Sequence, residues 1–193
     1  MPKAAARRRT LGAMNVLAIS GSLRAASINS AFCRATARLA PSWLQVAVFA
    51  GVADLPLFNP DLESNPSNSV QALRVAVDRA SALVIASPEY AHGISGAMKN
   101  TLDWLVSFEG FVHKPVAVIN TSSRAQHADA SLKEILQTMS AIIVPEASVT
   151  IPLLGTCITE EAMMDSLEVR SQIQGTLDTL YAFLSGGLSP PPR

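Results

Sequence analysis

The feature that most constrains the fold of this chain is a regular alternation of short apolar runs with stretches of helical periodicity. Short apolar runs with few interruptions are typical of strands buried on both faces of a parallel sheet. A crossover helix joins each such strand to the next, and right-handed crossovers place helices on both faces of the sheet. The predicted strands span 15–20, 44–49, 81–86 and 115–120, with a short fifth strand within 141–149, and the predicted helical regions span 29–39, 67–79, 96–108, 126–139 and 159–184.

This pattern predicts an α/β fold, a three-layer sandwich around a five-stranded parallel sheet. Five strands fit the flavodoxin-like order 2-1-3-4-5 better than the six-stranded dinucleotide-binding order, and ligand loops then follow the first, third and fourth strands. The chain has 193 residues, 49% of them hydrophobic, which suits one domain. We expect this domain to span 15–185, between a disordered basic tail over 1–14 and a disordered tail over 186–193.

Charge and cysteine content argue against several classes of function. The net charge is +0, and a basic cluster occurs only over 3–9, so no footprint for nucleic acid or an anionic membrane surface is visible. No apolar run reaches the roughly 18 residues that a membrane-spanning helix needs. Cys33 and Cys157 lack metal-ligand spacing, so we expect no metal and a reducing, cytoplasmic location.

The loop after the first predicted strand, residues 20–30, is called the phosphate loop here. It reads SGSLRAASINS and runs into a helix N-terminus, where backbone amides and the helix dipole favour an anion. Its hydroxyls add hydrogen-bond donors, and Arg24 adds a charged fork that suits phosphate oxygens. It matches neither GxGxxG nor a Walker A loop, which favours the terminal phosphate of a mononucleotide such as FMN. An ordinary serine-rich cap and turn is the alternative.

The loop after the third predicted strand, residues 88–93, is called the ring loop. It reads PEYAHG, so it combines a stiff proline, one aromatic face and a glycine that lets a ligand approach the backbone. We expect its backbone amides to bind the edge of a flavin and Tyr90 to stack on the ring, with a core tyrosine in a structural turn as the alternative. His92 either donates to the ring or lies at its rim. Glu89 bonds either backbone amides or an arginine of a neighbouring subunit.

Residues 120–127, which follow the fourth predicted strand, are called the third loop. They read NTSSRAQH, and their hydroxyls are expected to line the third wall of the pocket. Arg124 points either to a phosphate of the nicotinamide nucleotide or flavin, or to solvent. His113 and His127 have no obvious partner in the sequence. In the helix after the ring loop, we expect a solvated face and a core or interface tryptophan: Lys99, Asn100 and Asp103 on the face, and Trp104 inside.

Two segments of the chain together resemble the NADPH-dependent FMN reductase family: GSLRAASIN and SPEYAHGISGAMKNTLDWL. The resemblance extends over most of 15–184. The resemblance implies tightly bound FMN, NADPH or NADH as hydride donor, and a homodimer or homotetramer with the flavin near a subunit interface. The chain departs from the family pattern at Ala91, where many members have Asn, and at Ser95, where many have Pro. Its third loop also lacks the glycine-rich sequence that is common there in the family. The cofactor-binding residues implied are Ser20, Ser22, Arg24, Ser27, Asn29 and Ser30 for the phosphate loop, Pro88, Glu89, Tyr90, Ala91, His92 and Gly93 for the ring, and Ser122 for closing the pocket.

The function that the resemblance implies is an FMN-dependent NAD(P)H oxidoreductase with a small acceptor, namely a quinone, a flavin, an azo compound or a metal oxyanion. Hydride transfer to FMN needs no side-chain acid or base, so no catalytic residue is named. An electron-carrier flavodoxin fits less well, because the net charge is +0 and Tyr90 stands alone. A flavin-binding sensor without turnover is a further alternative. A hydrolase is the least favoured alternative, because the sequence lacks the GxSxG motif that carries a nucleophilic serine. The acceptor, the nicotinamide preference and the oligomer size stay open.

Overall fold

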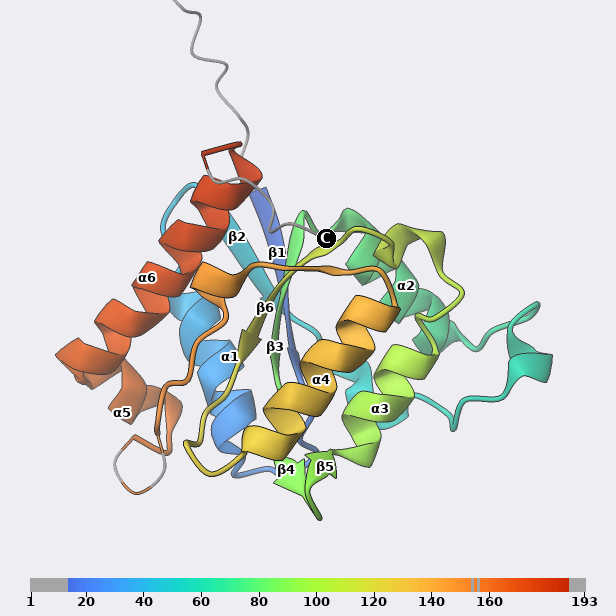
Figure 1. Ribbon diagram of the computed structural model, residues 1–193, viewed down its shortest axis with the longest axis horizontal. Helices are drawn as coiled ribbons and strands as arrows, with labels where there is room; N and C mark the ends of the chain where they lie inside the picture. The colour runs from blue at the N-terminus through green and yellow to red at the C-terminus, as the bar shows by residue number, and fades with distance from the viewer. Residues whose placement is uncertain (1–13, 154, 156, 188–193) are drawn as a thin grey trace, which may run out of the picture.

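The computed structural model describes residues 14–153, 155 and 157–187, so most of both predicted tails, 1–13 and 188–193, lies outside the described residues. Its centre is a sheet whose strand pairs are all parallel, in the order β2-β1-β3-β6-β7 (Figure 1). Numbered along the chain within this sheet, that order is 2-1-3-4-5, and the predicted flavodoxin-like fold is confirmed. The sheet consists of β1 (Met14–Ser20), β2 (Leu44–Val48), β3 (Ala82–Ala86), β6 (Pro115–Ile119) and β7 (Ile142–Ile143).

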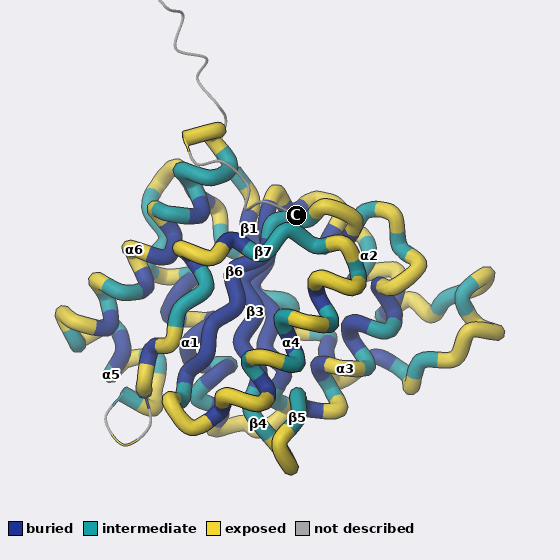
Figure 2. The backbone as a smooth tube through the Cα atoms, in the orientation of Figure 1, coloured by how far each residue is buried: buried dark blue, intermediate teal, exposed yellow. Residues whose placement is uncertain are grey.

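Helices cover both faces of the sheet, as the apolar runs require. All five residues of β3 are buried, and the central strands form the dark core of Figure 2. Side chains alternate between the faces, so that Val16 and Ala18 pack towards α1, α5 and α6, whereas Leu17 and Ile19 pack towards α2, α3 and α4. The α-helices are α1 (Ile28–Arg38), α2 (Asn68–Arg79), α3 (Gly96–Asp103), α4 (Gln126–Thr138), α5 (Glu160–Asp165) and α6 (Leu167–Leu184).

Two predicted helical regions differ in the structure, one because it is shorter and one because it is divided. The region 96–108 is helical only to Asp103, because Trp104 takes the C-cap position and the chain then turns. The region 159–184 is two helices, because Ser166 has an extended backbone that ends α5 while its hydroxyl caps α6. Short elements complete the fold: η1 (Gly51–Asp54), η2 (Pro60–Leu62), η3 (Glu109–Phe111), η4 (Pro145–Ala147) and a separate hairpin of β4 (Glu89–Tyr90) and β5 (Gly93–Ile94).

The expectation of a solvated face on α3 is wrong for one residue. Asn100 accepts a hydrogen bond from the amide of Phe58 at 2.8 Å and donates to the carbonyl of Pro56 at 2.9 Å. Trp104 is fully buried, as the core interpretation requires, and its Nε1 donates to the same carbonyl at 2.8 Å. These bonds fasten the long segment between β2 and α2 onto α3. Among the described residues, no helix is both long enough and apolar enough to cross a bilayer.

Candidate functional site

The three loops singled out in the sequence meet at the carboxyl edge of the sheet, around a cavity of about 730 Å³. This is where parallel α/β sheets bind their ligands, and the volume lies in the range of small-molecule sites. A fourth wall comes from residues 158–161, which lead into α5. Of the predicted site residues, those that line the cavity are Ser22, Arg24, Ser27, Asn29, Pro88, Glu89, Tyr90 and Ser122.

The phosphate loop is held by its own hydroxyls. Ser27 caps α1, because its Oγ accepts the amide of Ser30 at 3.2 Å. The hydroxyls of Ser20 and Ser30 lie 2.9 Å apart, and Ser20 Oγ also accepts the amide of Ser22 at 3.2 Å. Ser20 and Ser30 therefore brace the loop from behind and do not line the cavity. Arg24 lies exposed at its rim.

Asn29 joins the phosphate loop to the third loop. Its Oδ1 accepts the hydroxyl of Thr121 at 3.0 Å, and both residues are buried. The third loop is braced internally, since Asn120 Oδ1 accepts the amide of Ser122 at 3.0 Å and Ser122 Oγ accepts the amide of Arg124 at 3.2 Å. Thr121 and Arg124 both line the cavity. The sequence pointed to hydroxyls in this loop but not to Thr121 as the partner of Asn29.

The ring loop forms the β4–β5 hairpin, which the sequence did not predict. Its two turn residues, Ala91 and His92, have φ of +49° and +59°. A two-residue hairpin turn with positive φ at both central positions has the type I′ form, which favours Asn-Gly. Tyr90 is 52% exposed, so it is not a core residue, and it lines the cavity. The turn itself, Ala91 and His92 with Gly93, lies outside the residues that line the cavity.

Glu89 makes one of the two contacts that the sequence left open, a bond with a backbone amide. Its Oε2 accepts the amide of Ala128, in the first turn of α4, at 2.9 Å. Its Oε1 lies 3.5 Å from Nδ1 of His92. The rings of His92 and His127 meet edge to face, with centroids 4.4 Å apart. Glu89 therefore bonds a backbone amide of its own chain, and His127 has a partner that its sequence context did not reveal.

Gly21 fixes the phosphate loop against the residues on either side of the ring loop. Its amide donates to the carbonyl of Ala86 at 2.8 Å, and its carbonyl accepts the hydroxyl of Ser95 at 2.5 Å. A Cβ at this position would lie 2.6 Å from Oγ of Ser87 and 2.9 Å from Cβ of Met98. Only glycine fits here, because the start of α3 packs directly against the backbone of the loop.

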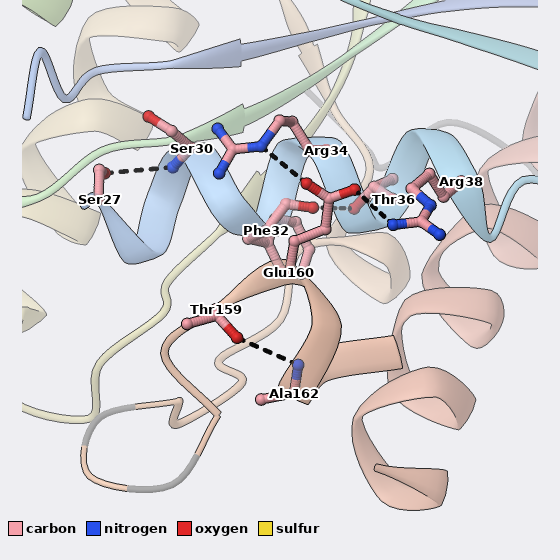
Figure 3. A network of polar contacts seen from close by, with 9 residues as sticks. All are labelled: Ser27, Ser30, Phe32, Arg34, Thr36, Arg38, Thr159, Glu160 and Ala162. Carbon is pink, nitrogen blue, oxygen red and sulfur yellow. Dashed lines mark hydrogen bonds and ion pairs between the residues drawn. The ribbon is translucent and has the colours of Figure 1, made fainter. Parts of the chain in front are cut away.

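The fourth wall contributes a charged group that sequence reasoning missed. Glu160 at the start of α5 accepts from Nε of Arg34 at 2.8 Å and from Nη1 of Arg38 at 3.1 Å (Figure 3). The hydrogen bond from Arg34, aided by Arg38, holds the pKa of the Glu160 carboxyl below its usual value, against the opposing effect of burial. Arg34 and Glu160 both line the cavity. The one available signal was the position of Arg34, a single helical turn beyond Ser30.

The residues present fit a flavin mononucleotide. The first amides of a helix lack intrahelical acceptors, and Ser27 takes only that of Ser30, which leaves the amides of Ile28 and Asn29 for a ligand. With Arg24 nearby, the N-terminus of α1 suits a phosphate. Tyr90 also lines the cavity, next to Pro88 in the chain, and offers an aromatic surface that suits a flat ring.

Comparison with known proteins gives the same result. The sequence profile of the NADPH-dependent FMN reductase family matches residues 14–154. A quinone reductase of Escherichia coli is 30% identical over 180 residues, which cover 89% of this chain and 92% of that protein. A 2-hydroxy-1,4-benzoquinone reductase of a Burkholderia species is 28% identical, with coverage of 89% and 97%.

Solved structures agree on the fold. The flavoenzyme NAD(P)H:acceptor oxidoreductase FerB of Paracoccus denitrificans has a TM-score of 0.67 and 22% identity, covering 87% of this chain and 97% of FerB. The family match confirms the predicted enzyme class, an oxidoreductase that uses FMN and NAD(P)H. On its residues, its fold and its relatives, the chain belongs to the NADPH-dependent FMN reductase family.

Proposed function

We propose that this protein uses NAD(P)H to reduce a quinone-type acceptor through FMN held in the cavity between the three loops. The observation that carries the proposal is the cavity itself, which is lined by the N-terminal residues of α1, by Arg24 and by Tyr90. The quinone class is supported by two relatives that match 89% of the chain, the quinone reductase and the 2-hydroxy-1,4-benzoquinone reductase.

The phosphate of FMN would lie at the N-terminus of α1. There the amides of Ile28 and Asn29 and the hydroxyls of Ser22 and Ser27 provide donors, and the helix dipole favours the negative charge. Arg24 adds a charge-assisted bond from the exposed rim. Ser20 and Ser30 would act indirectly, because their hydroxyls hold the loop in its conformation.

The ring loop would hold the isoalloxazine. Bound FMN supplies the redox chemistry, taking a hydride from NAD(P)H and passing electrons to the acceptor. Backbone amides of the ring loop beyond Pro88, which itself has no N–H, would orient the ring edge and favour negative charge on it, since they are fixed donors in a partly enclosed site. Tyr90 stacks on one side, and Ser122 closes the opposite wall. No side chain is assigned as a general acid or base.

One open face serves both substrates in this proposal. Among the described residues that line the cavity, Tyr90 is the one aromatic side chain. A second aromatic side chain would cover the other ring face and exclude a second ring. Without such a cover, NAD(P)H and the acceptor can occupy the same surface in turn, which gives a ping-pong cycle.

Assembly and location belong to the same proposal. Leu23 is 60% exposed, and it lies with Tyr90, Gly96 and Ala97 around a second hollow of about 350 Å³ beside the main cavity. Exposed apolar side chains next to a site support a homodimer or homotetramer with the flavin near the subunit interface. A reducing cytoplasm is supported by Cys33 and Cys157, which are both free.

The deciding experiment is an absorption spectrum of the purified protein, followed by anaerobic addition of NADPH or NADH and then of 1,4-benzoquinone. We expect a flavin band that bleaches with the nicotinamide nucleotide and returns with the quinone. A band that persists would instead indicate an electron carrier or sensor. No band after incubation with FMN would contradict the proposed site.

A further inference from the structure

Helix α4 is unusual in this fold because it begins without a side-chain cap of its own. Its N-cap residue is Ala125, and no side chain at that position accepts a hydrogen bond. A missing cap leaves the first amides of a helix without acceptors, which costs stability. The other five described α-helices all begin with a hydroxyl cap, from Ser27, Ser67, Ser95, Thr159 and Ser166.

Glu89 of the ring loop supplies the missing cap from a distant part of the sequence. Its Oε2 accepts the amide of Ala128, the third residue of α4, at 2.9 Å. A hydroxyl cap accepts the amide three residues further on, and this is the amide that a side chain at 125 would have taken. The carboxylate also places a negative charge at the positive end of the helix. Its side chain is only 16% exposed, so solvent screens this charge weakly.

The same carboxylate holds the turn of the hairpin. Oε1 of Glu89 faces Nδ1 of His92, whose ring packs against His127 in the first turn of α4. Ala91 and His92 occupy left-handed backbone conformations, which persist only where surrounding contacts enforce them. Figure 1 shows the β4–β5 hairpin beside the beginning of α4. Glu89 thus binds both the turn and the helix.

The beginning of α4 is also the end of the third loop, so this contact joins two walls of the cavity. Asn120 Nδ2 donates to the carbonyl of Ala125 at 3.2 Å, and the amide of Ala125 donates to the carbonyl of Ser122 at 3.1 Å. Ser122 and Arg124 are therefore fixed relative to the first turn of α4. A bond from Glu89 to that turn sets the distance between the ring loop and the third loop.

We infer that Glu89 is a positioning residue for the flavin site: its side chain caps α4 and thereby holds the ring loop at a fixed distance from the third loop. This inference rests on the proposed binding of FMN between these loops. Glu89 acts through the ring loop backbone and not through its own contact with the reacting atoms. It differs from a plain helix cap in a testable way, since a plain cap could be replaced by any local acceptor.

The test separates capping from positioning by moving the cap. Glu89→Ala removes both functions. Glu89→Ala combined with Ala125→Ser returns a local hydroxyl cap to α4 but leaves the ring loop detached. Ser67→Ala is the matched control, because it removes the cap of α2 away from the residues that line the cavity. Glu89→Gln tests rescue by a conservative change that keeps an acceptor oxygen.

Three readouts are needed: the Tm of the FMN-free protein, amide hydrogen exchange in 89–94 and 126–129, and FMN affinity with the visible circular dichroism of the bound flavin. We expect Glu89→Ala to lower Tm by about 2–4 °C and to weaken FMN binding about tenfold. The double variant should recover Tm and the protection of 126–129, but not the protection of 89–94 or the FMN affinity. Ser67→Ala should lower Tm alone. Glu89→Gln should retain most of the protection in both segments.

Recovery of FMN affinity and of ring-loop protection in the double variant would overturn the inference, because Glu89 would then be a helix cap and nothing more. Unchanged exchange in Glu89→Ala would overturn it as well. If the wild-type protein binds no FMN, the proposed function fails. Hydrogen exchange in the FMN-free variants still decides whether Glu89 positions the ring loop.

Discussion

The phosphate loop and the ring loop both line one cavity at one edge of the sheet, yet they differ in how they are held. The phosphate loop is braced from within, through Ser27 and through the pair of Ser20 and Ser30, and Asn29 and Gly21 add bonds to distant residues. The ring loop depends on a residue far along the chain, since Glu89 bonds Ala128, and its turn has an unfavourable backbone. Much of the phosphate loop is thus held by local bonds, whereas the turn of the ring loop depends on a contact that exists only in the assembled fold.

The largest effect is expected at Arg24, where a substitution should change ligand binding without changing the structure of the phosphate loop. Arg24→Ala should weaken FMN binding about 10–100-fold, the value of a charge-assisted hydrogen bond of roughly 1.5–3 kcal/mol. The Tm of the FMN-free protein should not change, because the side chain is exposed and the brace of the loop lies elsewhere. Fluorescence titration with FMN measures the first quantity and a thermal melt the second.

The matched control for this charge is Arg79→Ala, which removes an exposed arginine at the end of α2. FMN affinity should be unaffected there. Equal affinity in Arg24→Ala and the wild type would remove Arg24 from the phosphate site, and a large loss of Tm would show that the phosphate loop is not self-supporting.

The second effect concerns Gly21, where the phosphate loop touches the residues that flank the ring loop. Gly21→Ala places a methyl group 2.6 Å from Oγ of Ser87 and 2.9 Å from Cβ of Met98, so these segments must move apart. We expect a loss of about 1–3 kcal/mol in the free energy of unfolding, the usual cost of overpacking. Urea unfolding of the FMN-free protein measures it. Gly175→Ala in α6 is the control, because its Cβ meets nothing within 4 Å, and it should stabilise the protein.

The third effect tests the strain in the ring loop. Ala91 has φ of +49°, which costs an L-residue about 1–2 kcal/mol, whereas glycine adopts it freely but loses about 0.5–1 kcal/mol through its flexible unfolded state. Ala91→Gly should therefore stabilise the FMN-free protein by about 0.5–1 kcal/mol in urea unfolding, and Ala97→Gly in the regular helix α3 should destabilise it. A loss of stability in both variants would mean that the turn is not strained.

The contrast between the loops also explains what the sequence could predict. The strand order and the five apolar runs follow from the pattern along the chain, and the structure has them as expected. A serine-rich cap was only the alternative for the phosphate loop, and the structure shows that Ser27 caps α1. The hairpin was missed because Ala91 and His92 carry no Asn or Gly signal for a type I′ turn. The contacts Glu89–Ala128 and Arg34–Glu160 join residues 39 and 126 positions apart, and no periodicity reports such separations.

The residues that line the site were thus more predictable than the contacts that hold them in place. Eight of the thirteen predicted cofactor-binding residues line the cavity, because ligand loops follow strand ends in this fold. The others support it from behind or lie in the hairpin: Ser20, Ser30, Ala91, His92 and Gly93. Arg34 was missed because it follows the loop inside α1, and the wall over 158–161 was missed because it lies far along the chain from the phosphate loop.

The smallest effect is expected at the fourth wall, which combines features of both loops. Arg34 and Arg38 lower the pKa of the Glu160 carboxyl, so their bonds stabilise the fold at pH values above the ordinary glutamate pKa, and this contribution is lost as the pH falls through the lowered one. Glu160→Gln should cost less than about 1 kcal/mol at pH 7, because both arginines are about half exposed.

The sign of the pH dependence makes this small effect measurable. The difference in unfolding free energy between the wild type and Glu160→Gln should be constant near neutral pH and shrink towards zero in acid, as the wild-type carboxyl takes up its proton. Glu161→Gln is the control, since within the described part of the chain Glu161 has no ion pair. A difference that grows in acid would mean that Glu160 destabilises the fold when ionised, and the fourth wall would then be held by the packing of α5 on α1 and not by its charges.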